Sequence, residues 1–221
     1  MNLELTLLIL ESVLLAFTVV LLLFSIREGR SREKLIRGVD KAAKTFTRLE
    51  YFLAVVDSMS DAKVEIAGLI TGRPPSGSDI KRSRDIIDAI EKMSKSQVRI
   101  RYLLPQFHDR LHIGYLYSKA GAQIRFSTCP ILHDLRYMTV DEGVTIIGIP
   151  ESVGQKEATK KGYKIASEGL NSILKEHFES CWAAAVPFEE YLKEVISQTK
   201  ATARHLSKEL NIDEAELERF Y

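Results

Sequence analysis

The stretch AQIRFSTCPILHDLRYMTVDEGVTIIGIP, residues 122–150, decides the fold of this chain. Its apolar runs predict a strand over 123–127 and a β-hairpin over 136–149. An Asp-Glu-Gly turn breaks the hairpin, and Gly143 can supply the positive φ that a tight turn requires. The same stretch holds the chain's one motif-like group of polar side chains, which consists of His133, Asp134, Arg136 and Asp141.

Upstream of this stretch, strands and helices alternate. Apolar runs predict strands over 63–71 and 98–104, and helical patterns predict helices over 80–93 and 107–120. Gly121 follows the second helix, at the position where a glycine commonly ends one. This strand-helix-strand-helix-strand order predicts an α/β fold with a mixed, mainly parallel sheet flanked by helices.

Downstream of the hairpin, the pattern becomes helical. A short last strand is predicted over 163–166 and a helix over 168–185. The C-terminal tail, 187–221, is then expected to contain one helix over 188–210 and a short one from Asp213. The tail is therefore an extension of helices beyond the α/β domain.

An apolar segment of 22 residues, 5–26, lies near the N-terminus. As a helix it would be about 33 Å long, which is enough to cross the core of a bilayer. No Lys or Arg precedes it and no small-x-small pattern follows it, so a transmembrane helix is favoured over a cleaved signal peptide. Arg27, Arg30 and Arg32 follow directly, and the positive-inside rule then puts the C-terminal domain of a single-pass protein in the cytoplasm.

A helix is expected to begin at Ser31, and its apolar residues recur at alternating intervals of four and three. This spacing is the seam of a coiled coil and predicts a homodimer, although the second half, 46–59, could instead pack on the sheet of its own chain. The seam consists of Leu35, Val39, Ala42, Phe46, Leu49, Leu53 and Val56. Four segments are expected: a transmembrane helix over 1–26, a juxtamembrane helix over 27–60, the α/β domain over 61–186 and the helical tail over 187–221.

Composition argues against several classes of partner. The chain carries 31 basic and 30 acidic residues, and the acidic residues Glu214, Glu216 and Glu218 would repel phosphate, so nucleic acid is not an expected partner. The two cysteines, Cys129 and Cys181, fit a reducing compartment without a disulfide framework, although two cysteines also allow one bond. No Cys/His spacing matches a zinc site, and no metal or other cofactor is expected.

The motif-like group resembles the signature of the phospholipase D superfamily, H-x-K-x4-D followed by a segment like G-S-x-N. If Asp141 is aligned with the signature Asp, Arg136 takes the place of the Lys and Asp134 that of the His. If His133 is aligned instead, Leu135 and Val140 replace the Lys and the Asp. The resemblance covers roughly residues 63–182 and implies a single phospholipase D-like half.

In that family a His attacks phosphorus, a second His protonates the leaving group and Lys side chains hold the phosphoryl charge, with two copies of the motif paired in a homodimer. An Asp in the place of the attacking His lacks this chemistry, whereas Arg136 retains the ability to bind a phosphate. The resemblance therefore implies a membrane-anchored, non-catalytic domain that senses a small anionic or phosphate-bearing ligand or scaffolds a partner. Its candidate ligand-binding residues are Arg136, His133 and Ser78. The alternative is a homodimeric phosphodiesterase or nuclease that uses His133.

Overall fold

The structure is a computed structural model of the 221-residue chain. It describes residues 18, 43–75, 79–150, 159–199, 202–210 and 212–220. The chain divides into two compact units, 1–43 and 44–221, and the second unit contains all but the first residue of the elements that follow.

Among the described residues, eight strands form one sheet, in the order β1-β7-β6-β5-β2-β3-β4-β8. The strands are β1 (Ala43–Phe46), β2 (Glu65–Leu69), β3 (Arg99–Pro105), β4 (Gln123–Ser127), β5 (Arg136–Val140), β6 (Val144–Pro150), β7 (Thr159–Ala166) and β8 (Val186–Pro187). The helices are α2 (Arg48–Ser60), α3 (Asp79–Lys95), α4 (Leu111–Lys119), α5 (Ile131–Asp134), α6 (Glu168–Ala183), α7 (Phe188–Thr199), α8 (Ala203–Leu210) and α9 (Glu214–Leu217), with the 3-10 turns η1 (His108–Arg110) and η2 (Glu218–Phe220).

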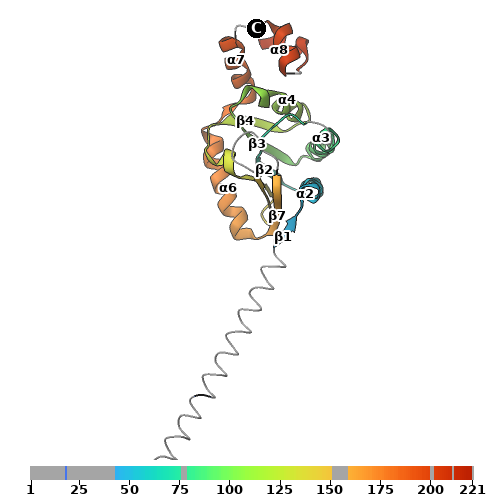
Figure 1. Ribbon diagram of the computed structural model, residues 1–221, viewed down its shortest axis with the longest axis vertical. Coiled ribbons are helices and arrows are strands. Elements are labelled where there is room, and N and C mark those ends of the chain that lie inside the picture. The colour runs from blue at the N-terminus through green and yellow to red at the C-terminus, as the bar shows by residue number, and fades with distance from the viewer. Residues whose placement is uncertain are drawn as a thin grey trace, which may run out of the picture. The chain divides into compact units, whose positions relative to one another are not determined.

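The sheet combines a parallel part with a larger antiparallel part. Strands β2, β3 and β4 are parallel neighbours, joined by the helices α3 and α4 (Figure 1). The strands β5, β6 and β7 continue the sheet from β2 as antiparallel neighbours, and β8 joins β4 in the same way. The expected helix-flanked sheet is confirmed, but the expectation of a mainly parallel sheet is wrong, because the predicted hairpin and the strand after it add antiparallel pairs.

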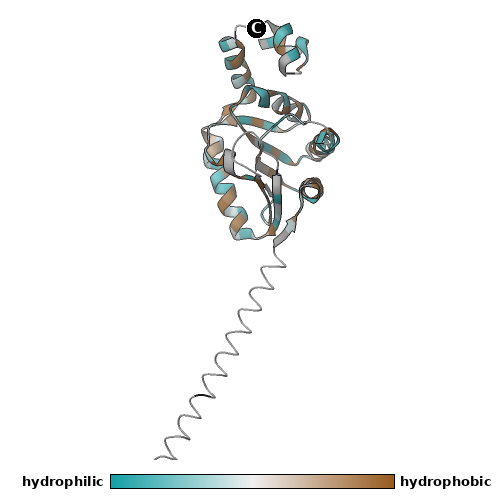
Figure 2. Cartoon of the chain, viewed as in Figure 1, coloured by the Kyte–Doolittle hydropathy of each residue, from teal (hydrophilic) through white to brown (hydrophobic). Residues whose placement is uncertain are grey.

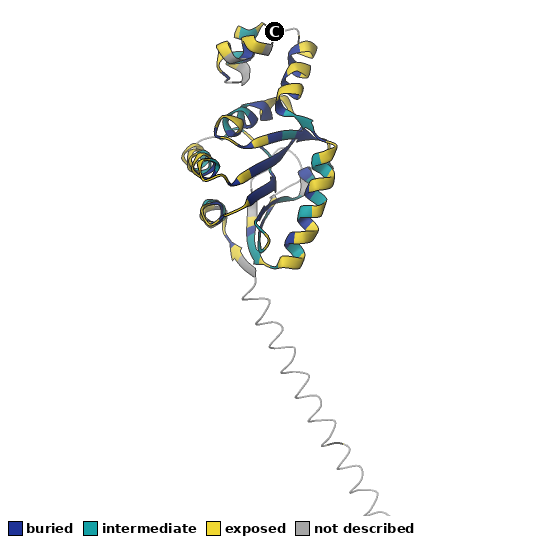
Figure 3. Cartoon of the chain, turned by 180° about the vertical axis from the view of Figure 1, so that it is seen from behind, coloured by how far each residue is buried: buried dark blue, intermediate teal, exposed yellow. Residues whose placement is uncertain are grey.

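Helices cover both faces of the sheet (Figures 1 and 3). Helices α2, α3, α4 and α7 share one core with the strands, to which Met59 and Ile90 belong. Helix α6 packs on the opposite face, where Phe178 is fully buried. Because side chains alternate along a strand, the neighbours Ile66 and Ala67 of β2 enter different cores. Figure 2 shows a largely hydrophilic α3, which buries only one side of its surface.

Local sequence signals set the ends of several elements. Thr47 precedes α2, and its backbone N–H and its hydroxyl donate hydrogen bonds to Glu50 at 2.9 and 2.8 Å. Gly121 follows α4 with a φ of 103°, as a glycine after a helix can. In the turn between β5 and β6 the residue with positive φ is Asp141, at 50°, and not Gly143 as expected.

The N-terminal part differs from the expected continuous helix. Residues Ala43–Phe46 form the strand β1, and the described part of the helix begins only at Arg48. Apart from Thr18, the segment 5–26 lies outside the described residues, and so do the seam residues before 43. None of the helices in the described part of the chain combines the length and the apolar character needed to cross a membrane.

The tail is joined to the core of the domain. In place of the single helix expected over 188–210, the structure describes α7 and α8, and residues 200 and 201 between them lie outside the description. Tyr191 of α7 stacks on Phe126 of β4 with ring centroids 4.4 Å apart. Since Leu192 and Val195 are also buried, α7 belongs to the same core as the sheet.

Candidate functional site

The motif-like group divides between the two ends of β5. Strands β2, β3 and β4 are parallel, so their carboxyl ends share one edge of the sheet, where ligands commonly bind in α/β folds. Leu69, the last residue of β2, pairs with Tyr137 of β5, and Arg136 pairs with Gly148 of β6. Arg136 therefore lies at this carboxyl edge, at the start of β5.

Two further candidate residues precede Arg136 at the same edge. The backbone of His133 and Asp134 forms the end of α5, which lies between β4 and β5. Their side chains, and all of Ser78, lie outside what the structure describes. The edge thus brings together Arg136 and the backbone of His133 and Asp134.

An aromatic ring from α2 lies near Arg136. Space for this ring exists because β6 and β7 carry glycines: a Cβ at Gly148 would come within 2.7 Å of the Tyr51 hydroxyl oxygen, and one at Gly162 within 2.2 Å of its Cδ2. Burial raises the pKa of Tyr51 to about 12, and the positive charge of Arg136 acts in the opposite direction. The absence of a side chain at Gly148 therefore leaves room for Tyr51.

Asp141 lies at the far end of β5, about 17 Å from Arg136 for a strand of five residues. Its carboxylate accepts hydrogen bonds from the backbone N–H groups of Lys63, Val64 and Glu65 at 2.9–3.0 Å. Burial alone would raise the pKa of Asp141, but these hydrogen bonds outweigh it and lower the pKa. The structure thus does not bring Asp141 to Arg136, and Asp141 holds the start of β2.

A charged network ties α6 to the same end of β2. Glu65, which is 2% exposed, accepts hydrogen bonds from Arg101 and forms ion pairs with Arg99 at 2.8 Å and Lys175 at 2.9 Å. Arg101 is also paired with Glu179 of α6. The Arg101 guanidinium lies over the rings of Phe178 and Trp182, at 5.1 and 5.3 Å from their centroids. We interpret this network as structural, because its buried charges are paired.

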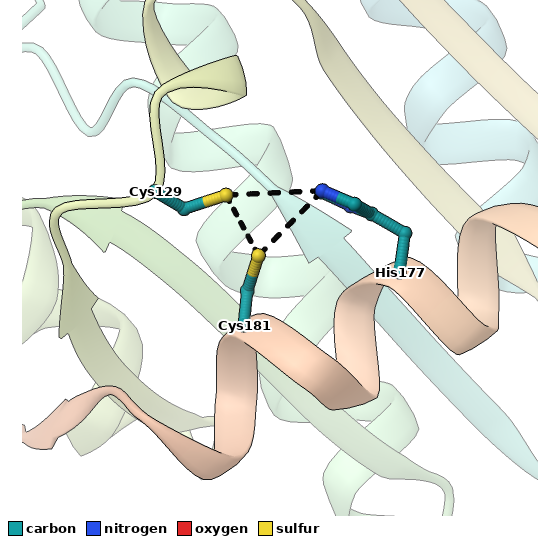
Figure 4. Close-up of side chains that lie close together, drawn as sticks. All are labelled: Cys129, His177 and Cys181. Carbon is teal, nitrogen blue, oxygen red and sulfur yellow. Dashed lines mark hydrogen bonds between the residues drawn. The ribbon is translucent and has the colours of Figure 1, made fainter.

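A cluster of three side chains of types that can bind a metal ion lies on the α6 face of the sheet (Figure 4). Cys129 comes from the loop after β4, and His177 and Cys181 lie one turn apart on α6. The Sγ atoms are 2.7 Å apart, and the Nε2 atom of His177 is 3.8 Å from the Sγ of Cys129 and 3.6 Å from that of Cys181. Both cysteines are free, and all three residues are half-buried.

The ring of His177 is fixed by a buried tyrosine. The Tyr137 hydroxyl donates a hydrogen bond to the Leu174 carbonyl oxygen at 2.9 Å, and its oxygen lies 2.9 Å from the Nδ1 atom of His177. Burial raises the pKa of Tyr137, so this hydroxyl keeps its proton. Burial, then the hydrogen bond to Cys129, raises the pKa of the Cys181 thiol to about 12.

Sequence reasoning missed this cluster for a specific reason. Cys129 and His177 are 48 positions apart, and only the folded sheet brings the loop after β4 against α6. The available signal was the spacing of four between His177 and Cys181, which puts both on one face of a helix. A pair with such spacing is not specific without its third member.

Comparison with known proteins identifies the fold. No family model and no curated protein matches the sequence. The phospholipase D family member Nuc from Salmonella typhimurium has a similar structure, with a TM-score of 0.50 and 16% identity over 66% of this chain and 96% of Nuc. NucT from Helicobacter pylori gives a TM-score of 0.50 and 12% identity over 66% of this chain and 98% of NucT. At these identities the likeness shows the fold alone, and it confirms the expected phospholipase D-like fold.

Proposed function

We propose that this phospholipase D-like domain is membrane-anchored and binds a small anionic or phosphate-bearing ligand without hydrolysing it, in order to sense that ligand or to scaffold a partner. The observation that carries the proposal is the position of Arg136 at the carboxyl edge of the sheet, a strand's length from Asp141. The residue two positions before Arg136 is Asp134, where the family signature has its attacking His.

The chemistry of these residues supports binding over turnover. A guanidinium is always charged at neutral pH and can hold two oxygens of a phosphate at once. A carboxylate in the place of the imidazole would repel the same phosphate and has no proton to give to a leaving group at neutral pH. The carboxyl edge would then retain anion recognition without the nucleophile.

The anchor is the segment 5–26, of which the structure describes only Thr18, and it is proposed from the sequence alone. With Arg27, Arg30 and Arg32 on the cytoplasmic side, the domain would face the cytoplasm. Chains confined to one membrane meet at a raised effective concentration, which supports a homodimer.

Ligand binding is tested by thermal unfolding of the full-length protein in detergent, with inorganic phosphate and a panel of nucleotides and sugar phosphates. At about 100 times Kd, a ligand should stabilise the protein by about 2.7 kcal/mol, which raises Tm by about 5–10 °C for a domain of this size. Arg136→Ala should abolish the shift, and Lys208→Ala, an exposed change on α8, should preserve it. A panel without any shift, or a shift that survives Arg136→Ala, would contradict the proposal.

The alternative, a homodimeric phosphodiesterase, keeps one observation in its favour. His133 belongs to α5 at the same edge of the sheet as Arg136. The discriminating assay is hydrolysis of bis(p-nitrophenyl) phosphate by the full-length protein. We expect no hydrolysis above the buffer rate. A measurable rate that disappears in His133→Ala would replace the binding proposal with the enzyme.

A further inference from the structure

The half-buried cluster of Cys129, His177 and Cys181 has no part in the anion site proposed above (Figure 4). We propose that these three side chains bind one thiophilic divalent metal ion, of which Zn²⁺ is the expected occupant. Thiolate sulfur and imidazole nitrogen are the ligands that Zn²⁺ takes in proteins, whereas Mg²⁺ and Ca²⁺ take oxygen. The proposal rests on the convergence, the orientation and the burial of the three groups.

The distances suit a tetrahedral ion with little rearrangement. For Zn–S bonds of about 2.3 Å and Zn–N bonds of about 2.0 Å, neighbouring ligand atoms in a tetrahedron lie about 3.5–3.8 Å apart. The two distances from His177 Nε2 to sulfur, 3.8 and 3.6 Å, already fall close to this range. The Sγ atoms, 2.7 Å apart, would have to separate by about 1 Å, which a small rotation of the Cys129 side chain on its loop supplies.

The imidazole of His177 is held in the form that binds metal. The single proton of the Tyr137 hydroxyl goes to the Leu174 carbonyl oxygen, so the 2.9 Å contact with Nδ1 is an N–H of His177 donating to the Tyr137 oxygen. Neutral His177 therefore carries its lone pair on Nε2, the atom near both sulfurs. A ring N–H fixed by a neighbouring acceptor is the usual second-shell arrangement of a metal-binding His.

A metal ion would engage all three side chains of the cluster, whereas a disulfide would engage only the two cysteines. A bond between Cys129 and Cys181 would remove both thiol protons and leave the Nε2 lone pair of His177 without a donor from either sulfur. An ion would instead accept electron pairs from both sulfurs and from Nε2. In the described part of the chain, no fourth His, Cys, Asp or Glu joins the cluster, so a water or an external ligand would complete the tetrahedron.

A bound metal ion would join two segments that are far apart in the sequence. Cys129 lies two residues before α5, which leads directly to Arg136, and the other two ligands lie on α6. The ion would therefore pin the segment between β4 and β5 to α6.

The test uses the full-length protein, freed of metal with a chelator under reducing conditions and titrated with Co²⁺ as the spectroscopic probe. We expect one Co²⁺ per chain, with intense visible bands and thiolate-to-cobalt charge transfer in the near ultraviolet, and displacement of Co²⁺ by Zn²⁺. The chain has only two cysteines, so charge transfer in the unaltered protein identifies at least one of Cys129 and Cys181 as a ligand. Binding without charge transfer would overturn the proposal.

Variants assign the remaining roles. Cys129→Ser and Cys181→Ser should each reduce the charge-transfer intensity, and His177→Gln should weaken Co²⁺ binding at least tenfold. Tyr137→Phe removes the acceptor that orients His177 and should weaken binding by about 10–100-fold, the usual effect of a second-shell change. His205→Ala, an exposed change on α8, is the matched control and should bind Co²⁺ as the unaltered protein does.

The competing outcome is a redox pair. If the reduced protein binds no Co²⁺, the metal proposal is overturned, and a chain that oxidised glutathione makes lighter by two hydrogens, with Cys129 joined to Cys181, would identify the cluster as a redox pair. Co²⁺ binding of unchanged affinity in the Cys129→Ser/Cys181→Ser double variant would overturn it equally.

Discussion

At the turn between β5 and β6, the carboxylate of Asp141 accepts three backbone hydrogen bonds from the chain at the start of β2. Asp141 itself adopts a φ of 50°. Asp141→Ala removes the acceptors and leaves an alanine in a left-handed conformation, so we expect the free energy of unfolding to fall by about 2–3 kcal/mol. Asp141→Asn tolerates that φ and keeps one acceptor oxygen, and should lose about half as much. Urea unfolding measures both, and equal losses would contradict this role for the carboxylate.

The same carboxylate contributes to acid sensitivity, together with Glu65. Burial alone would raise the pKa of Glu65, but its partners Lys175, Arg101 and Arg99 outweigh it and lower the pKa, and the pKa of Asp141 is also lowered. A lowered pKa in the folded state means that stability is fully present above the ordinary values, 4.5 and 3.8, and is lost as the pH falls through the lower folded values. We therefore expect a free energy of unfolding that is level above about pH 5 and declines below it.

Urea unfolding as a function of pH tests this expectation. Asp141→Asn should reduce the decline, because it removes one of the carboxylates whose pKa is lowered in the folded state. A decline that begins near neutral pH, or one that is unchanged in Asp141→Asn, would assign acid sensitivity to other groups.

At the scale of elements, α2 is seated on β6 and β7 by a ring packed against two glycines. A Cβ at Gly162 would lie 2.2 Å from Cδ2, 2.8 Å from Cγ and 2.9 Å from Cβ of Tyr51. The Cβ of Tyr51 is fixed to the backbone of α2. Rotation of the Tyr51 ring therefore cannot relieve the clash with a Cβ added at position 162, and α2 must shift. Gly162→Ala should therefore destabilise the protein by about 1–3 kcal/mol.

Gly143→Ala is the matched control, because a Cβ there meets nothing within 4 Å and the residue does not have a positive φ. It should change Tm by less than about 2 °C, the size of a neutral surface change. If Gly162→Ala leaves Tm as high as Gly143→Ala does, the contact with Tyr51 does not hold α2 in place.

Sequence patterns predicted the elements of the domain far better than their arrangement. Apolar runs gave the strands β2 to β7, because each strand's character depends on its own residues. The antiparallel pairing of β5 with β2 joins segments that are far apart in the sequence, and the short strand β1 interrupts a spacing that suited a helix. The cluster of Cys129, His177 and Cys181 could not be predicted for the same reason, because its members come together only in the folded chain.

At the scale of the whole molecule, one segment links the two proposed sites. The chain between β4 and β5 begins next to Cys129 and ends at Arg136, and α6, which supplies His177 and Cys181, is tied to β2 and β3 through Glu65 and Arg101. A change in the cluster of Cys129, His177 and Cys181 would therefore act on the segment that precedes Arg136. It would do so through α6, which the ion pairs hold to the sheet.

The proposed homodimer can now be tested at residues that the fold leaves accessible. Of the predicted seam, Phe46 is 7% exposed within β1, so Phe46→Asp would unfold the domain and would not report on assembly. Leu49 and Leu53 are 53% and 57% exposed and lie one turn apart on α2. Apolar side chains on the surface of a helix are the part of the predicted seam that a second copy could cover.

The double variant Leu49→Asp/Leu53→Asp should therefore convert the full-length protein in detergent from twice the mass of one chain to a single mass, because four carboxylates would face one another across the seam. Light scattering with correction for bound detergent measures this mass. Ile173→Asp, which is 65% exposed on α6 and outside the seam, controls for the loss of an apolar surface residue and should leave the dimer intact. A dimer that survives the double variant must be held by another surface, and the seam would then have no role in assembly.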